Sequence, residues 1–247
     1  MLARIEGDRV SSLAPFTDEN FGAIAANEHG FMLRVKPGTP SVMALWKADN
    51  GTAKPLCQWP AVPGGRSSPY SYSHPLSLFP ITPDGHTLVT TDNAPGTPTI
   101  IRIWRRGDDA TPPVEAASFS TLQGSTLIWA LALTPDGQRI AVAAHDGLSL
   151  WSLQNDKPTQ LWYQPHIWIS VAFSPDGRQL AASFGSTPGI HGVAIFDEAG
   201  ENKAQWELPA APTDLAFAPD GRHLLTANLN GTVYILRLKE SAKPTPP

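Results

Sequence analysis

The chain has 247 residues, 41% of them hydrophobic and 16% charged, a composition that predicts a folded globular protein and excludes an intrinsically disordered one. Its formal net charge of −4 argues against a surface that binds nucleic acid by neutralising phosphates, so we expect no nucleic-acid partner. Cys57 is the single cysteine, which excludes an internal disulfide. No apolar run reaches a membrane-spanning length and no signal peptide opens the chain, so we expect no membrane association and a cytoplasmic location.

The N-terminal part of the chain contains a degenerate hairpin. The sequence AIAANEHG, Ala23 to Gly30, aligns with ALALTPDG further along the chain, and Trp46 follows Gly30 at the end of another strand candidate. A rival register with its turn at Thr17 to Asn20 needs 26 residues to reach Trp46, so we prefer the turn at Gly30. The first 22 residues precede this hairpin, and their segment RVSSLAPF, residues 9–16, is a further strand candidate.

Four later hairpins share one turn signature, in which Pro-Asp-Gly follows Ser, Thr or Ala. In residues 168–177, WISVAFSPDG, an apolar strand runs into a turn where Ser174 accepts a backbone hydrogen bond, Pro175 fixes φ and Gly177 takes a left-handed conformation. The other copies end at Gly85, Gly137 and Gly221. The turn glycines, with Gly30, are separated by 55, 52, 40 and 44 residues, so the chain is built from repeats.

Each hairpin is followed by a third strand and a candidate fourth strand. The third strands end in Trp104, Trp151, Phe196 and Leu236. The fourth-strand candidates are PLCQWP, VEAASF, TQLWYQP and KAQWELP, and a proline at the end of a strand is tolerated at a sheet edge. Almost no segment has helical periodicity. We therefore predict an all-β fold, a β-propeller of four-stranded antiparallel blades, with five blades visible in the sequence.

These hairpins resemble the WD40-repeat family, and VAFSPDG followed by LAAS is its commonest bacterial form. The resemblance covers roughly residues 20–238. Only Asp197 occupies the place of the family's Asp after the third-strand aromatic, and the family's Gly-His pair is missing. TolB-like and lactonase-like propellers share the same turn, so these subfamilies stay open. We place the propeller at residues 1–239, with repeats around 23–60, 75–120, 127–165, 167–209 and 212–238.

The last repeat ends at its third strand, and the tail from 240 to 247 is polar and rich in proline. We expect residues 1–22 to supply the missing outer strand and close the ring, because pairing the two ends removes an exposed edge. The family usually has seven blades. The alternatives are therefore the last part of a larger propeller, or an open arc completed by another chain.

No catalytic or metal-binding motif is present. The turn aspartates are explained by turn geometry, the histidines lack the spacing of a zinc site, and there is no nucleophile elbow or phosphate-binding glycine loop. Asp214, His166 and His74 are the few candidates for a channel enzyme. We therefore predict no cofactor, no metal and no catalysis.

The candidate binding surface is the face opposite the Pro-Asp-Gly turns, where the first strands begin. In the family this is the usual docking surface, and aromatic residues and arginine are typical of interface hot spots. A long insertion, residues 60–75, adds aromatic residues there. The candidate residues are Arg66, Tyr70, Tyr72, His74, Trp129, His166, Trp168 and His191.

The sequence thus favours a non-catalytic scaffold that binds a protein or peptide of unknown identity on this face. A lactonase-like or hydrolase propeller is the first alternative. The second is a sensor or regulatory repeat region of a longer signalling protein.

Overall fold

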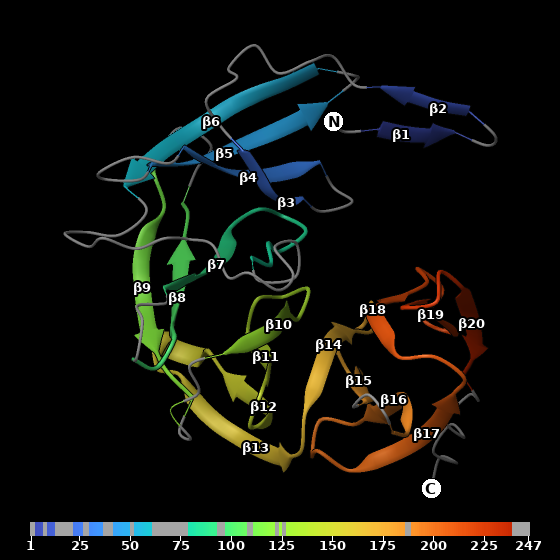
Figure 1. The fold of residues 1–247 in the computed structure, drawn as a ribbon. Helices are drawn as coiled ribbons and strands as arrows, with labels where there is room; N and C mark the ends of the chain where they lie inside the picture. Colours follow the sequence, from blue (N-terminus) through green and yellow to red (C-terminus); the bar gives the residue numbers. More distant parts are fainter. Residues whose placement is uncertain are drawn as a thin grey trace, which may run out of the picture. The chain divides into compact units, whose positions relative to one another are not determined.

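In the computed structural model the described regular structure is β, apart from a 3₁₀ turn at Gln154–Asp156 (Figure 1). The structure describes residues 3–6, 9–12, 22–26, 30–36, 42–49, 52–60, 79–92, 97–107, 111–121, 124, 127–185 and 189–238. The chain divides into two compact units, Met1–Ser120 and Thr121–Pro247. None of the described residues forms a helix with the length and apolarity needed to cross a lipid bilayer.

The first unit contains a ribbon and two sheets, all antiparallel. The ribbon pairs β1 (Ala3–Glu6) with β2 (Arg9–Ser12). The first sheet has the order β3 (Gly22–Ala26), β4 (Phe31–Lys36), β5 (Val42–Asp49) and β6 (Thr52–Pro60). The second sheet has the order β7 (Thr87–Asp92), β8 (Ile100–Arg105) and β9 (Val114–Phe119), preceded by a bridge from Ile81 to Leu88.

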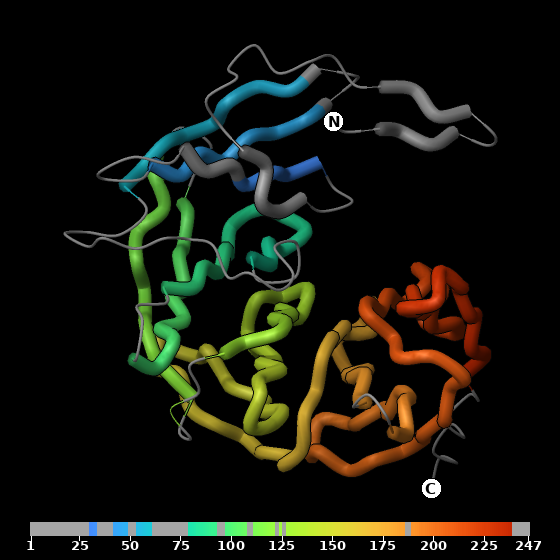
Figure 2. The backbone as a smooth tube through the Cα atoms, in the orientation of Figure 1, coloured from blue at the N-terminus to red at the C-terminus, as the bar shows by residue number. Residues whose placement is uncertain are grey.

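The second unit contains three sheets in which the strand order follows the chain order. The third sheet is β10 (Ile128–Leu133), β11 (Arg139–Ala144), β12 (Gly147–Ser152) and β13 (Thr159–Pro165). The fourth sheet is β14 (Trp168–Phe173), β15 (Leu180–Gly185), β16 (His191–Phe196) and β17 (Asn202–Leu208). The fifth sheet is β18 (Pro212–Phe217), β19 (His223–Asn228) and β20 (Val233–Arg237). Figure 2 shows the backbone of each sheet running back and forth through successive strands.

The predicted turn chemistry is confirmed at residue level. In the Ser174–Gly177 turn the hydroxyl of Ser174 donates to Asp176 Oδ1 at 2.6 Å and accepts from the Gln179 N–H at 2.9 Å. Gly177 has φ +71° and donates its N–H to the Ser174 carbonyl at 2.8 Å. Thr82 and Thr134 make the same pair of hydroxyl bonds in their own turns. The turn carboxylates therefore hold β-hairpins together, because they bond within their own turns.

The predicted all-β architecture is confirmed, including the fourth strands β6, β9, β13 and β17. The turn at Gly30, with φ +82°, joins β3 to β4, as the preferred register requires. In the first four sheets the pairing of third and fourth strands shifts register next to the third-strand aromatic, at Trp46, Trp104, Trp151 and Phe196. This repeated irregularity shows that the sheets are copies of one unit.

The two chain ends are described in separate units. β2 pairs with β1, and β20 pairs with β19. The closing role of residues 1–22 and the domain boundary at residue 239 stay predictions.

The core of the second unit lies between neighbouring sheets. Leu148 and Leu150 of β12 cluster with Trp168 and Val171 of β14. Val193 and Ile195 of β16 cluster with Leu215, Leu224 and Leu238 of the next sheet in the same way. The fourth sheet therefore covers the apolar face of the third, and the fifth sheet covers that of the fourth.

Candidate functional site

Several of the predicted binding residues lie at one end of the fourth sheet. The strand register places Trp168 opposite Phe184, Gly185 opposite His191 and His191 opposite Leu208. The Ser174–Gly177 turn joins β14 to β15 at the other end of the sheet. We call the end that carries residues 165–168 and 189–191 the loop face.

The neighbouring sheets of this unit add their first strands to the same arrangement. β10 packs beside β14, and β14 packs beside β18. Trp129 lies near the start of β10 and is half-buried. It is the predicted site residue that the third sheet contributes.

His166 has an unusual backbone conformation on the loop face. It is exposed and has φ 91°, a positive value that few residues other than glycine adopt, at a cost of about 1–2 kcal/mol, although His is enriched there together with Asn and Asp. The next residue, Ile167, has 38% of its surface exposed. Strained residues of this kind concentrate at binding and catalytic sites, because the surrounding structure must hold them.

Trp168 holds this strained segment in place. Its ring packs edge-on against Phe184 and Phe196, with centroid distances of 5.8 and 5.4 Å, and only 7% of its surface is exposed. Its indole N–H donates to the Pro165 carbonyl at 3.2 Å. Trp168 therefore belongs to the core, and its hydrogen bond to Pro165 ties residues 165–167 to that core.

His191 lies on the neighbouring strand end with an incompletely satisfied ring. Its Nδ1 is buried and has no hydrogen-bond partner. A Cβ atom added at Gly185 would lie 2.8 Å from this nitrogen, so the close approach of His191 requires glycine at that position. Ile190, directly before His191, is 64% exposed. The loop face therefore combines two imidazoles with two exposed isoleucines.

The other predicted candidates are not joined to this cluster by described contacts. Arg66, Tyr70, Tyr72 and His74 lie outside the described residues. Asp214 accepts hydrogen bonds from the Ser170 hydroxyl at 3.1 Å and from the Leu215 N–H at 2.9 Å. Within the described part of the chain no group of three His, Cys, Asp or Glu side chains has the geometry of a metal site.

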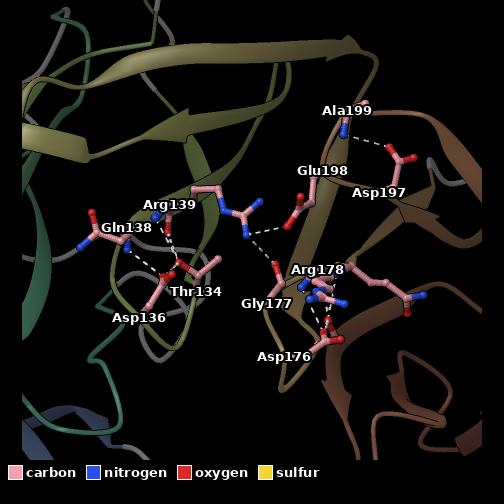
Figure 3. A network of polar contacts seen from close by, with 12 residues as sticks. Thr134, Asp136, Gln138, Arg139, Asp176, Gly177, Arg178, Asp197, Glu198 and Ala199 are labelled. Atoms are coloured by element: carbon pink, nitrogen blue, oxygen red, sulfur yellow. Dashed lines mark hydrogen bonds and ion pairs between the residues drawn. The ribbon is translucent and has the colours of Figure 1, made fainter.

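The opposite face, which carries the Pro-Asp-Gly turns, holds the third and fourth sheets together. Arg139 donates to the Gly177 carbonyl at 3.1 Å and to Glu198 at 3.0 Å (Figure 3). Burial opposes ionisation of Asp136, but the Thr134 hydroxyl and the Gln138 N–H outweigh it and lower the pKa of this carboxyl below its usual value. This face is thus a structural joint between sheets.

Ile167 and Ile190 were not among the residues predicted from the sequence. Both are apolar residues that stand beside a histidine in a short connection between strands. The signal that would have found Ile190 is its position directly after the STPG segment, outside any strand pattern.

Comparison with known proteins identifies the fold. The family model described as "WD domain, G-beta repeat" matches residues 117–150 and 205–236. Both matches run from a fourth strand through the three strands of the next sheet. The β-propeller domain of Cps50 (Swd1) from Myceliophteria thermophila is similar to this chain with a TM-score of 0.62 at 13% identity, over 92% of this chain and 68% of that one. The chain is a WD40-like β-propeller.

One curated relative of this WD40-like propeller is eukaryotic translation initiation factor 3 subunit I of Candida albicans. The two sequences are 27% identical in a 131-residue alignment that covers 47% of this chain and 37% of the relative. The match thus spans little more than a third of the relative's length.

Proposed function

We propose that this WD40-like propeller is a non-catalytic scaffold that binds a protein or peptide on its loop face. The observation that carries the proposal is the convergence of His166, Ile167, Ile190 and His191 at one end of one sheet. Exposed aliphatic side chains beside hydrogen-bonding rings form the apolar centre and polar surround of a protein interface.

The rigidity of this surface supports the proposal. His166 and Ile167 follow Pro165, whose carbonyl accepts a hydrogen bond from the buried Trp168, and the His191 ring lies close to Gly185. A binding surface on a rigid sheet end loses little conformational entropy when a partner docks.

The class of partner follows from surface chemistry and from the relative. The loop-face residues carry no fixed charge, which favours a protein over an anionic ligand. The initiation-factor relative is named as a subunit, which also supports a protein partner. A channel hydrolase using Asp214 and His166 has less support, because the described contacts of Asp214 are with Ser170 and Leu215.

The test is site-specific photo-crosslinking from the loop face. A photoreactive phenylalanine analogue replaces Ile167 or Ile190 in separate variants of the full chain, and products from a cell lysate are identified by mass spectrometry. We expect the same protein from both positions. The Ile190→Asp substitution should abolish the crosslink from position 167, because a charge then faces the apolar centre of the interface.

Val114 supplies the matched control, because it is 70% exposed on β9 and belongs to a different sheet in the other compact unit. The analogue at position 114 should give none of the products seen from positions 167 and 190, and Val114→Asp should leave those products unchanged. Products that are identical at all three positions would remove the loop face as the binding surface.

A further inference from the structure

Exposed aliphatic side chains continue from the loop face of the fourth sheet onto the fifth sheet. Leu229, between β19 and β20, is 70% exposed, and its N–H donates to the Ala211 carbonyl at 2.9 Å. Ala211 ends the connection from β17 to β18, residues 209–211, which spans at most about 11 Å. β17 enters this connection beside His191, the neighbour of Ile190. Ile190 and Leu229 therefore flank one short connection between two sheets.

Charged side chains are divided unequally between the two ends of the sheets in this unit. We call the end that carries the Pro-Asp-Gly turns the turn face; Arg139 and Arg178 are seen there in Figure 3. Within residues 127–185 and 189–238 the turn face holds every lysine and arginine, namely Arg139, Lys157, Arg178, Lys203, Arg222 and Arg237. Seven carboxylates lie at the same end, so its formal charge is −1. The loop-face end holds three carboxylates and no cation, a formal charge of −3.

The three loop-face carboxylates come from three different sheets. Asp146 directly precedes β12 and is half-buried, and Glu207 is the next-to-last residue of β17 and exposed. Asp214, the third residue of β18, is exposed as well, and its described hydrogen bonds come from the Ser170 hydroxyl and the Leu215 N–H. A surface with charge of one sign attracts a partner of the opposite sign and disfavours partners of its own sign.

The charges of the turn face are used differently, because they stabilise the fold itself. The ion pairs described in this unit all lie there and join Arg139 to Glu198, Lys203 to Asp197 and Glu201, and His223 to Asp220. Within the part of this unit that the structure describes, the side chains of Asp146 and Glu207 take part in no ion pair or hydrogen bond. Their charges are therefore available to a partner.

We infer that the partner segment bound at the loop face is basic and amphipathic, an inference that rests on the proposed function. Its aliphatic side chains cover Ile167, Ile190 and Leu229. Its lysine or arginine side chains reach Asp146, Glu207 and Asp214, which border this apolar surface on three sheets. Lysine and arginine suit both parts of the surface, because their long stems pack on apolar groups while their charged ends reach the carboxylates.

The probe is a phage-displayed library of short random peptides, selected at low salt on the immobilised full chain and counter-selected on the Leu229→Ser variant. We expect the peptides that require Leu229 to be enriched in lysine and arginine beside aliphatic residues, and depleted in aspartate and glutamate. Leu161→Ser is the matched control, because Leu161 is 48% exposed on β13 and lies within that strand. Counter-selection on this control should remove none of these peptides.

A second pair of variants tests the charge of the loop face with the strongest selected peptide, titrated by fluorescence polarisation. Glu207→Lys should weaken binding by up to about fivefold, as expected for an exposed ion pair. Glu201→Lys makes the same change in net charge directly before the other end of β17 and should leave the affinity unchanged. Added salt should weaken binding to the parent chain and shrink its difference from Glu207→Lys.

The outcomes separate this inference from the proposed function. Peptides that require Leu229 but show no enrichment in lysine and arginine would overturn the inference and leave the loop face as a binding surface. Equal weakening by Glu201→Lys and Glu207→Lys would overturn it as well. If neither Leu229→Ser nor Ile190→Asp removes any peptide, the proposed function itself fails. Sedimentation velocity that shows a dimer of the parent chain, lost in Leu229→Ser, would assign the surface to a second copy and also overturn the inference.

Discussion

The fourth and fifth sheets are built from nearly the same pattern but end in different environments. Val193 and Ile195 lie in the core between these sheets, whereas Val233 and Ile235 at the matching positions face solvent. Strand order, turn position and pairing are the same in both sheets up to the third strand. The comparison shows that the local sequence specifies the strand. The neighbouring sheet decides whether the strand's apolar side chains are buried, and therefore how much they stabilise the folded state.

The largest expected difference between the two sheets concerns an aspartate at the matching isoleucines. Ile195→Asp should destabilise the second unit by about 4 kcal/mol or more, because it places a charge in a dry core. Ile235→Asp should change the free energy of unfolding by less than about 1 kcal/mol, because Ile235 is exposed. Urea denaturation followed by tryptophan fluorescence measures both. Similar losses in the two variants would show that the edge of β20 is covered in solution.

The second prediction compares two glycines at the start of the third strands. A Cβ at Gly192 would lie 2.1 Å from the Trp206 carbonyl oxygen and 2.6 Å from the Phe184 ring, so Gly192→Ala should cost about 3 kcal/mol. Gly231 has open space around it and only the strain of φ +81°, so Gly231→Ala should cost about 1 kcal/mol. Thermal unfolding measured by circular dichroism ranks the two variants. A larger loss of stability in Gly231→Ala than in Gly192→Ala would contradict the close packing of Trp206 and Phe184 around Gly192.

The third and smallest effect concerns the hydroxyl that the fourth sheet has and the fifth lacks. Ser174 bonds to Asp176 and Gln179, while the equivalent Ala218 leaves its turn held by backbone bonds and by Asp220. Ser174→Ala should cost about 1–2 kcal/mol, and Ala218→Ser should regain up to about 1 kcal/mol. Both variants are measured by urea denaturation at neutral pH, and a gain from Ser174→Ala would contradict the role of this hydroxyl.

The same pair of turns predicts a pH dependence. Burial opposes ionisation of Asp176, but the Ser174 hydroxyl and the Arg178 N–H lower its pKa below the usual value. A carboxyl with a lowered pKa stabilises the folded state above its unfolded pKa of about 3.9, and this stabilisation is lost as the pH falls through the folded value. The difference between the parent chain and Ser174→Ala should therefore shrink below about pH 4. A difference that grows on acidification would mean that Asp176 is not the acceptor.

Much of the fold was predictable, because the decisive interactions are local. The Pro-Asp-Gly turns, the preferred first turn at Gly30 and the four outer strands follow from residues within a few positions of one another. The candidate site was only partly predictable. His166 and His191 lie where the repeat geometry puts them, but the burial of Trp168 follows from its contacts with Phe184 and Phe196, which the repeat pattern does not contain.

The sequence by itself determined the repeating antiparallel unit, because turn residues and strand alternation act within each hairpin. The tertiary structure decided which apolar faces are buried within the second unit, and it decided that Trp168 packs in the core next to the loop face. These properties depend on the sheet that packs next in space, and no single repeat encodes its neighbour.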